Sequence, residues 1–365
     1  MIRLLKPTEL LEPPREAGCR AAPGRIERGY FETTSSATVE RTDRVAVAIV
    51  NWNSGDALLH CLAALARQSL APHRVVVVDN GSTDGSCEGL ERQYPAVELI
   101  RLGVNIGFAA ANNLVSRLVD DCHWIAMLNC DAAPHVDWLA ELVRAVQLHP
   151  DCAVFSSKLL RASAPDLLDG AGDCYHASGA AWRRWYGRPA GEQPERIEEV
   201  FSPCAAAAMY RHDVLLEVGG LDAGYFCYFE DVDLGFRLRL AGHRALHVPR
   251  SVVRHVGSGT TAVGSDFAVY HGHRNLVWTY VKNMPGMLFW QYLPQHLLFN
   301  LATLLCFSLR GQARTIFRAK WHALVGLPGA WRQRRHVQSA RKITPRQLRR
   351  ALLKGWLRPY FGRRN

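Results

Sequence analysis

Apolar residues between positions 45 and 128 form short runs that alternate with longer segments of mixed polarity. Such runs are typical of buried strands, and they predict strands at 45–50, 75–78, 97–102 and 124–128. After the first run, Leu58, Leu62 and Leu65 recur at the spacing of an amphipathic helix. Because strand and helix alternate, the pattern predicts an α/β fold whose largely parallel sheet is flanked by helices.

Polar residues follow each of the first three predicted strands, where the chain turns toward a helix. They include Asn51 and Asn53, the segment 79–84 and the loop 103–107. The carboxyl ends of parallel strands share one edge of a sheet, so these segments are expected to line one crevice. Asp79 suits an acceptor for the imide N–H of a pyrimidine, whereas Gly81 and Ser82 let the backbone approach a ribose or phosphate. The alternative is an ordinary turn, since Asn-Gly is common turn chemistry.

The fourth predicted strand ends in Asn129-Cys130-Asp131. The two-residue period of a strand puts the side chains of Asn129 and Asp131 on the same side. An acidic residue at this edge can hold a divalent cation and a phosphate. Taken alone, such an Asp more often opens a turn or a helix. The chain has neither the dinucleotide-binding glycine motif nor a P-loop, so those two readings lose their support.

A second acidic group follows the aromatic run 225–229. Glu230, Asp231 and Asp233 stand at the start of a helix predicted by the spacing of Val232, Phe236 and Leu240. Carboxylates there can simply complement the helix dipole, but three of them behind an aromatic run make a substrate site plausible. His255 follows a predicted strand nearby, although a lone His is more often structural than a ligand.

Charge and cysteine content add information on the compartment. All 33 acidic residues lie in the first 266 positions with 26 of the 44 basic ones, so this part has a net charge of −7. Residues 267–365 carry 18 basic residues and no acidic ones, which predicts a polyanionic partner for this tail. The ten cysteines have no disulfide or zinc spacing, and the start of the chain lacks an apolar signal segment. We therefore expect reduced thiols and a cytoplasmic protein.

The two ends of the chain differ from its centre. Residues 1–43 are rich in Pro, Gly, Arg, Ser and Thr and are expected to be a partly disordered extension. The stretch 287–307 is apolar and approaches the length of a membrane span, but Pro294 and polar residues interrupt it. An in-plane or re-entrant helix is at least as plausible. Arg310, Arg314 and Arg318 follow as a predicted basic stripe beside Ile316, Phe317 and Trp321. We expect contact with an anionic membrane, the alternative being a helical lid on the catalytic domain.

The ordered set of motifs resembles the inverting family 2 glycosyltransferases, in particular the rhamnosyltransferase-like branch that acts on bacterial surface polysaccharides. The resemblance covers about residues 45–283. It rests on 50–53, 78–84, 105–108, 128–131, 219–222, 229–233 and His255, with 274–275 and 282–285 also matching that branch. It implies a GT-A-type fold whose catalytic domain (44–266) has a nucleotide-binding half (44–131) and an acceptor half (132–266). The charge and apolar pattern predict a helical, basic, membrane-associating region at 267–365.

The resemblance also implies roles for individual residues. Asp131 would bind a divalent metal, Mg²⁺ or Mn²⁺, with His255 as a further metal-side residue. Asp231 would be the catalytic base, with Glu230 and Asp233 positioning the acceptor. The expected donor-binding residues are Asn51, Asn53, Asp79, Gly81, Ser82, Asn105, Gly107, Asn113, Asn129 and Asp131. The first position of the metal motif is Asn129 rather than Asp, and a neutral amide binds a hard cation more weakly than a carboxylate does.

The predicted reaction is transfer of a sugar, with inversion, from a nucleotide-sugar donor to a hydroxyl of a glycan or polyprenyl-diphosphate-linked acceptor. The branch makes dTDP-rhamnose the leading donor, while UDP-linked sugars stay open. The expected location is the inner face of the cell membrane. A sugar-phosphate nucleotidyltransferase is disfavoured because the turn after the first strand, residues 51–55, has no Arg or Lys. A nucleic-acid-binding module would use the basic tail but leaves the acidic cluster at 230–233 unexplained.

Overall fold

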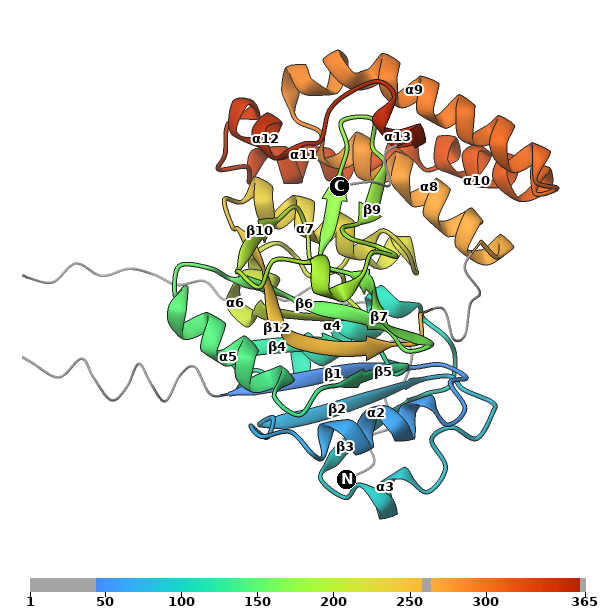
Figure 1. Cartoon of the computed structure of the whole chain (residues 1–365). Coiled ribbons are helices and arrows are strands. Elements are labelled where there is room, and N and C mark those ends of the chain that lie inside the picture. Colours follow the sequence, from blue (N-terminus) through green and yellow to red (C-terminus); the bar gives the residue numbers. More distant parts are fainter. Residues whose placement is uncertain (1–43, 258–263, 362–365) are drawn as a thin grey trace, which may run out of the picture.

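The computed structural model describes residues 44–257 and 264–361, so the expected N-terminal extension, residues 1–43, lies outside the described residues. A mixed ten-stranded sheet forms the centre of the molecule, with helices on both faces and a helical region above it (Figure 1). The path of the sheet is β10-β12-β6-β11-β4-β1-β2-β3, with β5 added on β12 and β7 on β6.

The four strands predicted from the apolar runs form a parallel unit. They are β1 (Val45–Asn51), β2 (Arg74–Asn80), β3 (Val97–Leu102) and β4 (Trp124–Leu128). The helices between and after them are α2 (Ala57–Leu65), α3 (Leu90–Gln93), α4 (Phe108–Leu118) and α5 (Trp138–Leu148). On β1, Val45, Val47 and Ile49 face the core beneath α2 and α5, while the residues between them face the core beneath α4. Burial on both faces explains the continuous apolar runs.

The second half of the sheet makes it mixed. Its strands are β5 (Ala132–Pro134), β6 (Val154–Arg161), β7 (Ala164–Gly170), β10 (Glu198–Val200), β11 (Ala207–Arg211) and β12 (Ala245–His255). β11 runs antiparallel between β4 and β6, whereas β12 runs parallel to β6. A separate hairpin, β8 (Asp173–Tyr175) with β9 (Ala181–Arg183), stands beside the sheet. The predicted α/β class with a mixed, largely parallel sheet is confirmed.

The helix α7 (Glu230–Leu240) lies between two cores. Leu234 and Leu238 pack toward the sheet, with α6 (His212–Glu217) on the same face. Val232, Phe236 and Leu240 pack instead against the C-terminal helices. The predicted helical spacing is therefore correct, and it marks the face that the C-terminal region covers.

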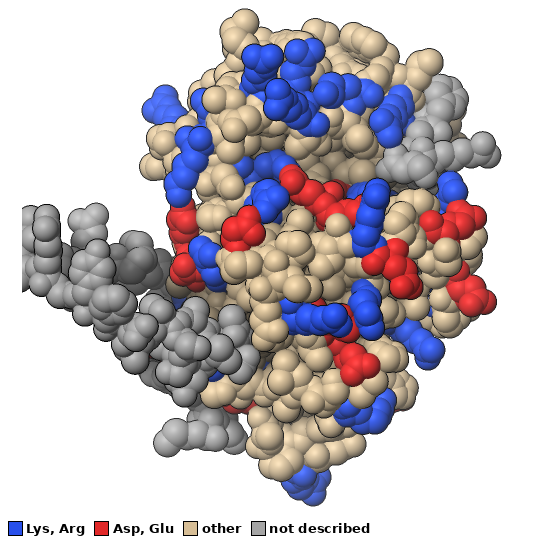
Figure 2. Space-filling view, turned by 60° about the vertical axis from the view of Figure 1, so that its left-hand side comes forward, with Lys and Arg blue, Asp and Glu red and all other residues tan. Residues whose placement is uncertain are grey.

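The C-terminal region is helical, as predicted. It consists of α8 (Asp266–Asn283), α9 (Gly286–Leu309), α10 (Ala313–Val325), α11 (Leu327–Ser339), α12 (Pro345–Ala351) and α13 (Arg358–Phe361). Lys and Arg gather over this region and acidic side chains lie below it in Figure 2. Among the described helices, α9 alone is long and apolar enough to cross a membrane, and 22% of its most apolar window is buried.

The basic stripe expected at residues 310–318 is not continuous. Arg310 is the C-cap of α9, and Gly311, with a φ of 82°, separates it from α10, which carries Arg314 and Arg318. The apolar neighbours also separate, because Ile316 is fully buried while Phe317 and Trp321 are exposed. A spacing of four residues keeps one face only within a single helix, and the chain turns between Arg310 and Arg314.

Candidate active site

The polar side chains at the ends of β1 and β2 bind mainly to one another. Asn51 is fully buried, and its Nδ2 donates to Ser82 Oγ (3.1 Å) and Ser86 Oγ (2.9 Å). Ser82 Oγ also accepts from the N–H of Asn53, whose own Oδ1 accepts from the N–H of Thr83 (2.8 Å). Asn51, Asn53 and Ser82 thus tie the first turn to the second. Their placement at one edge agrees with the prediction, but these contacts are structural.

Asp79 and Asn80 end β2 with different partners. Asp79 Oδ1 accepts from the N–H of Ser82 (3.1 Å), and its Oδ2 has no hydrogen-bond partner among the described residues. Asn80 Nδ2 donates to Asn105 Oδ1 (2.8 Å), and Asn80 Oδ1 accepts from the N–H of Ile106 (2.9 Å). Asn105 therefore belongs to the support of this edge, whereas Asp79 keeps an oxygen for a ligand.

Three predicted donor residues have packing roles that the sequence does not show. A Cβ on Gly81 would lie 2.8 Å from the backbone of Val104, and one on Gly107 would lie 2.7 Å from the ring of Phe226. Both residues also have a positive φ, which glycine adopts without strain. Asn113 Nδ2 donates to the carbonyl of Leu221 (2.7 Å), and its Oδ1 accepts from the N–H of Leu221 (2.9 Å). Gly107 and Asn113 thus join the two halves of the chain.

The Asn129-Cys130-Asp131 turn lies beside His255. Strand β12 places His255 opposite Ala132 of β5, and the N–H of Val256 donates to the carbonyl of Asp131 (3.1 Å). His255 Nε2 lies 3.3 Å from Asp131 Oδ1 and 3.3 Å from Asn129 Nδ2. Its Nδ1 lies 2.8 Å from Oδ2 of Asp169. Two elements distant in sequence therefore meet at this turn.

The donor set of this turn fits a divalent cation. Asn129 Oδ1 is buried and has no hydrogen-bond partner among the described residues, next to the carboxylate of Asp131 and the Nε2 of His255. An oxygen, a carboxylate and an imidazole are ligands that Mn²⁺ and Mg²⁺ sites use. The contact from His255 Nδ1 to Asp169 is the carboxylate support that a metal-binding His commonly has. Burial disfavours a protonated ring, but the hydrogen bonds to Asp131 and Asp169 outweigh it and raise the pKa of His255.

A chain of charged contacts runs from this turn to the helix α7. Asp169, at the end of β7, contacts His255 on one side and pairs with Arg183 on the other. The charge of Arg183 also acts on the carboxylates of Asp173 and Asp231, although no ion pair joins it to either of them among the described residues. A carboxylate oxygen of Asp173, one of Asp231 and the Sγ of Cys204 lie within 4.8 Å of one another. Asp131 and Asp231 therefore belong to one connected cluster, although a hundred residues separate them in the sequence.

A second link joins the same two carboxylates through the backbone. The N–H of Asn129 donates to the carbonyl of Ala206 (3.0 Å), and the N–H of Ala205 donates to Asp231 Oδ2 (3.2 Å). Two consecutive residues before β11 thus bind the two sides of the site. Ala206 holds the Asn129-Cys130-Asp131 turn, and Ala205 holds the carboxylate of Asp231 on α7. The small, apolar stretch 202–210 forms this bridge.

Asp231 has the environment of a base. Burial raises its pKa, and the N–H groups of Ala205 and Val232 moderate that rise by hydrogen-bonding its oxygens. Burial, with the charge of Asp231, also raises the pKa of Asp173 to about 8. Asp231 lies at the start of α7, where the dipole favours an anion, but burial has the larger effect. A carboxylate with a raised pKa is a better proton acceptor at neutral pH.

Glu230 and Asp233 flank Asp231 but differ from each other. Glu230 is buried, its Oε2 has no hydrogen-bond partner among the described residues, and burial raises its pKa. Asp233 is fully buried and points toward α8, where Lys282 (2.8 Å), Asn283 (2.7 Å) and Tyr225 (3.2 Å) contact its Oδ1. Arg237 contacts its Oδ2 (2.8 Å). Against the effect of burial, Lys282 and Arg237 lower the pKa of Asp233 to about 2. Asp233 holds α7 in place rather than facing an acceptor.

The aromatic run before α7 is strained and is held by α8. Phe226, Tyr228 and Phe229 have φ values of 67°, 65° and 70°, which cost about 1–3 kcal/mol each for such residues. Asn275 Nδ2 donates to the carbonyls of Tyr225, Cys227 and Tyr228 at 2.7–3.0 Å. The motifs at 274–275 and 282–285 therefore have a structural link to the acidic motif at 229–233. Asn275 holds the aromatic run before it, and Lys282 binds its Asp233.

Asp169, Asp173 and Arg183 were not among the residues predicted from the sequence. The available signal was Asp169-Gly-Ala-Gly-Asp173, in which two acidic residues flank a glycine-rich turn. Because this segment lies between the recognised motifs and forms β7 and β8, neither a strand end nor a helix start marked it. Arg183 carried no local signal, since only the β8–β9 pairing brings it opposite Asp173.

Comparisons with known proteins agree with this geometry. The family model "Glycosyltransferase like family 2" matches residues 43–280. The chain is 31% identical over 264 residues to an N-acetylglucosaminyl-diphospho-decaprenol L-rhamnosyltransferase of Mycobacterium tuberculosis, covering 63% of this chain and 82% of that protein. It is 25% identical over 255 residues to an O-antigen biosynthesis protein of Myxococcus xanthus, covering 65% of this chain but 20% of that protein.

A solved structure supports the fold. The crystal structure of GalNAc-T7 with UDP, GalNAc and Mn²⁺ aligns with a TM-score of 0.50 at 16% identity, covering 58% of this chain and 43% of that one. This similarity concerns the arrangement of the sheet and its helices. Together with the family match, which spans both acidic clusters, it shows that this chain belongs to the family 2 glycosyltransferases and has a GT-A-like fold.

Proposed function

We propose that the protein transfers L-rhamnose from dTDP-rhamnose to a hydroxyl of an N-acetylglucosamine that is linked through a diphosphate to a polyprenol. The ion pairs from Asp131 through His255 and Asp169 to Arg183, whose charge acts on Asp231, carry this proposal. It allows a donor diphosphate and an acceptor hydroxyl to meet at one cluster. The sugar and the lipid carrier follow from the name of the mycobacterial relative.

Each side of the cluster has a separate task in this proposal. Asp79 Oδ2 accepts a hydrogen bond from the base of the nucleotide. The carboxylate of Asp231 accepts the proton of the acceptor hydroxyl as its oxygen attacks the anomeric carbon, and the nucleoside diphosphate leaves with the electron pair of the broken C–O bond. Attack opposite the leaving group inverts the anomeric centre. The charge of Arg183 lies where it can stabilise the anions that gather there.

Asp131, His255 and Asn129 would hold the divalent cation of the reaction. When bound, Mg²⁺ or Mn²⁺ neutralises the charge that develops on the leaving diphosphate. Because Asn129 supplies a neutral oxygen, we expect weaker binding than at a two-carboxylate motif. The position of Asp169 behind His255 fixes the ring so that Nε2 points toward Asp131.

We also propose that the C-terminal region associates with the inner face of the cell membrane. Trp290, Leu301 and Trp321 have exposed fractions of 62%, 63% and 64%, and no acidic residue follows position 266. Apolar and basic side chains on one helical region suit an anionic lipid surface, with about 1 kcal/mol for each basic residue near it. Flotation with anionic and neutral liposomes tests this: co-flotation with anionic vesicles only is expected, and protein that stays at the bottom with both contradicts it.

A donor and acceptor screen tests the transfer. Purified protein with Mg²⁺ or Mn²⁺ is incubated with dTDP-rhamnose or a panel of UDP- and GDP-sugars and with a polyprenyl-diphosphate N-acetylglucosamine. Mass spectrometry is expected to detect one added deoxyhexose with dTDP-rhamnose only, and NMR an inverted anomeric configuration. Transfer of another sugar would correct the donor, and donor hydrolysis without any transfer would contradict the acceptor class.

A further inference from the structure

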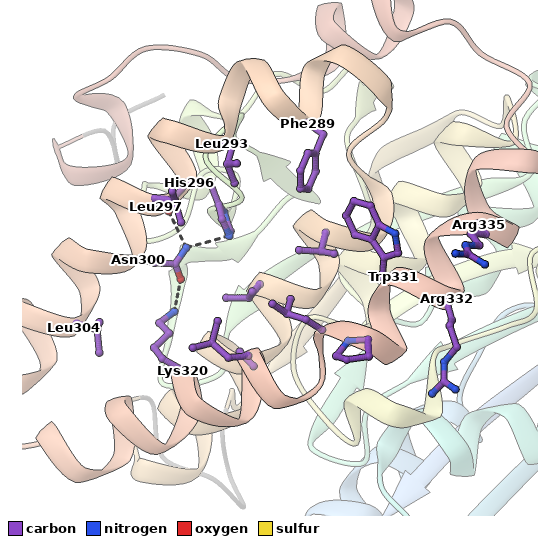
Figure 3. Close-up of a pocket in the computed structure, with 16 residues that line it drawn as sticks. Phe289, Leu293, His296, Leu297, Asn300, Leu304, Lys320, Trp331, Arg332 and Arg335 are labelled. Atoms are coloured by element: carbon purple, nitrogen blue, oxygen red, sulfur yellow. Dashed lines mark hydrogen bonds between the residues drawn. The ribbon is translucent and has the colours of Figure 1, made fainter.

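An apolar cavity of about 760 Å³ lies among α8, α9, α10 and α11 (Figure 3). Its walls are mainly apolar side chains, among them Val281, Phe289, Leu293 and Trp331. Volumes of this size are typical of sites for drug-sized ligands. The cavity is distinct from the cluster around Asp131 and Asp231, and none of the sites described so far uses it.

The cavity opens onto the outer face of the helical region. Leu297 on α9, Leu324 on α10 and Trp331 on α11 all line it, yet their exposed fractions are 59%, 57% and 42%. They continue the exposed apolar face that includes Leu301 and Trp321. A contiguous apolar surface of this kind indicates a binding site for an apolar partner. A chain drawn from a lipid layer on that face could enter without crossing a polar surface.

Cations at the cavity lack acidic partners within the region. Lys320 Nζ donates to Asn300 Oδ1 (2.5 Å) and to the carbonyl of His273 (3.2 Å), both neutral acceptors. Burial lowers the pKa of Lys320 to about 7. Arg332 and Arg335 also line the cavity (Figure 3), and no described carboxylate pairs with any of these three cations. An apolar chain that carries an anionic phosphate group would complement both features.

The position of α8 relates the cavity to the transfer site. Val277 and Val281 of α8 line the cavity, while Lys282 and Asn283 reach Asp233 on α7. Asp233 lies two residues from the proposed base. The cavity is therefore separated from the helix that carries Asp231 by a single helix.

We infer that this cavity binds the isoprenoid tail of the polyprenyl-diphosphate acceptor, with Arg332 and Arg335 near the phosphate end. The inference rests on the proposed lipid-linked acceptor and adds a location for its tail. It differs from general membrane contact, which would use the whole exposed apolar face rather than the cavity walls.

A matched pair of variants tests the inference. Leu297→Glu places a charge in the cavity wall, whereas Leu301→Glu places the same charge one turn further along α9, at 63% exposure and outside the cavity. Both sites are exposed, so thermal melts are expected to match those of the wild type. Leu324→Glu on α10 repeats the cavity change from another helix.

Binding is measured by equilibrium dialysis with radiolabelled farnesyl diphosphate, with excess dTDP and Mg²⁺ present to occupy the donor site. We expect farnesyl diphosphate to bind at least tenfold more tightly than inorganic diphosphate, and Leu297→Glu and Leu324→Glu to remove at least that factor. Leu301→Glu is expected to keep wild-type affinity. Equal binding of the two diphosphates, or equal losses in Leu297→Glu and Leu301→Glu, would overturn the cavity assignment.

Transfer assays separate this inference from the proposed function. With acceptors that share the same head group, Leu297→Glu should lower kcat/KM at least tenfold for a long isoprenoid tail and leave a short-tailed acceptor unchanged. Transfer that is independent of tail length in the wild type would overturn the cavity while the proposed reaction stands. Binding of farnesyl diphosphate that depends on Leu297, without transfer to any lipid acceptor, would support the cavity and contradict the proposed reaction.

Discussion

The two halves of the site are built in opposite ways. In the first half, the ends of consecutive parallel strands place Asn51, Asn53 and Asn80 at one edge, where their amides bond to Ser82, to the N–H of Thr83 and to Asn105. In the second half, charged groups come from four separate segments and include Asp169, Arg183 and His255. The first half is a neutral, hydrogen-bonded frame, and the second concentrates buried charge.

This difference predicts how each half responds to substitution and to pH. Hydrogen bonds between neutral groups gain about 0.5–1.5 kcal/mol each, and these groups do not titrate. Buried carboxylates shift their pKa and depend strongly on their partners. Substitutions of the carboxylates in the second half should therefore change chemistry and pH dependence, whereas those in the first half, and of the metal-side residue His255, should change affinity for the donor.

The largest effect is expected for Asp231→Asn. Loss of a general base costs about 10²–10⁴-fold in turnover, while donor affinity should stay within about twofold because Asp231 lies in the second half. Steady-state kinetics and calorimetry with the donor measure the two quantities. In the wild type, turnover should fall as the pH falls through the raised pKa of Asp231, because the base must be ionised. Normal turnover in the variant would remove Asp231 from the role of base.

Asp233→Asn tests the neighbouring carboxylate, which we consider structural. It leaves Arg237 with an uncharged partner inside the protein, while Lys282 keeps its ion pair with Asp222 (2.6 Å). Breaking a buried ion pair costs about 3–5 kcal/mol. Because the folded pKa of Asp233 is about 2, below its ordinary value, its contribution is present above about pH 4 and is lost as the pH falls toward 2. Denaturant unfolding measures both effects.

The matched control is Asp213→Asn. Asp213 stands in the first turn of α6 and pairs with Arg211, but its side chain is 71% exposed. Exposed pairs contribute about 0–1 kcal/mol. Equal destabilisation by the two variants would show that Asp233 is not the centre of a buried network.

Asp131→Ala and His255→Ala sharpen the comparison from the donor side. If these residues hold the cation, each should weaken donor binding in the presence of Mn²⁺, by about 10–100-fold for His255 on the scale of metal-site substitutions. Without metal, the variants and the wild type should bind the donor alike. Asp121→Asn, an exposed carboxylate paired with Arg74, is the control. Calorimetry with and without EDTA gives the answer, and unchanged affinity in Asp131→Ala would exclude it from the metal site.

The sequence predicted the first half of the site better than the second, for a physical reason. Strand ends such as Asn51, Asp79 and Asn129 follow apolar runs that can be read locally, and parallel topology then brings them together. Asp169 and Arg183 meet His255 and Asp231 only through the antiparallel additions β7 to β9, which have no periodic signal. Short strands with partly polar sequences give little evidence of their partners.

The same limit applied to individual side chains. Residues 230–233 were predicted as one acidic cluster, but α7 turns Asp233 toward α8 and leaves Asp231 at the site. A helix rotates by about 100° per residue, so carboxylates two positions apart point to different sides. The family match confirms a glycosyltransferase rather than a nucleotidyltransferase, whereas the roles of individual residues stay predictions.

Asp173→Asn is expected to change stability with the opposite sign. Burial raises the folded pKa of Asp173 to about 8, above its ordinary value, so the folded protein holds a proton that the unfolded chain releases. The stability from this group is therefore complete below about pH 4 and is lost as the pH rises toward 8. An amide keeps the neutral form at every pH, so the variant should melt at a higher temperature than the wild type at pH 9 and at a similar one at pH 4.

Asp166→Asn serves as the control, because Asp166 is an exposed carboxylate on the neighbouring strand β7. Its substitution should change the melting temperature little at either pH. If Asp173→Asn melted below the wild type at pH 9, Asp173 would be a stabilising anion, held by Arg183 rather than opposed by burial and by Asp231. Each buried charge in the second half would then have a partner that stabilises it, as each polar group of the first half does. The two halves would differ only in the topology that brings their residues together.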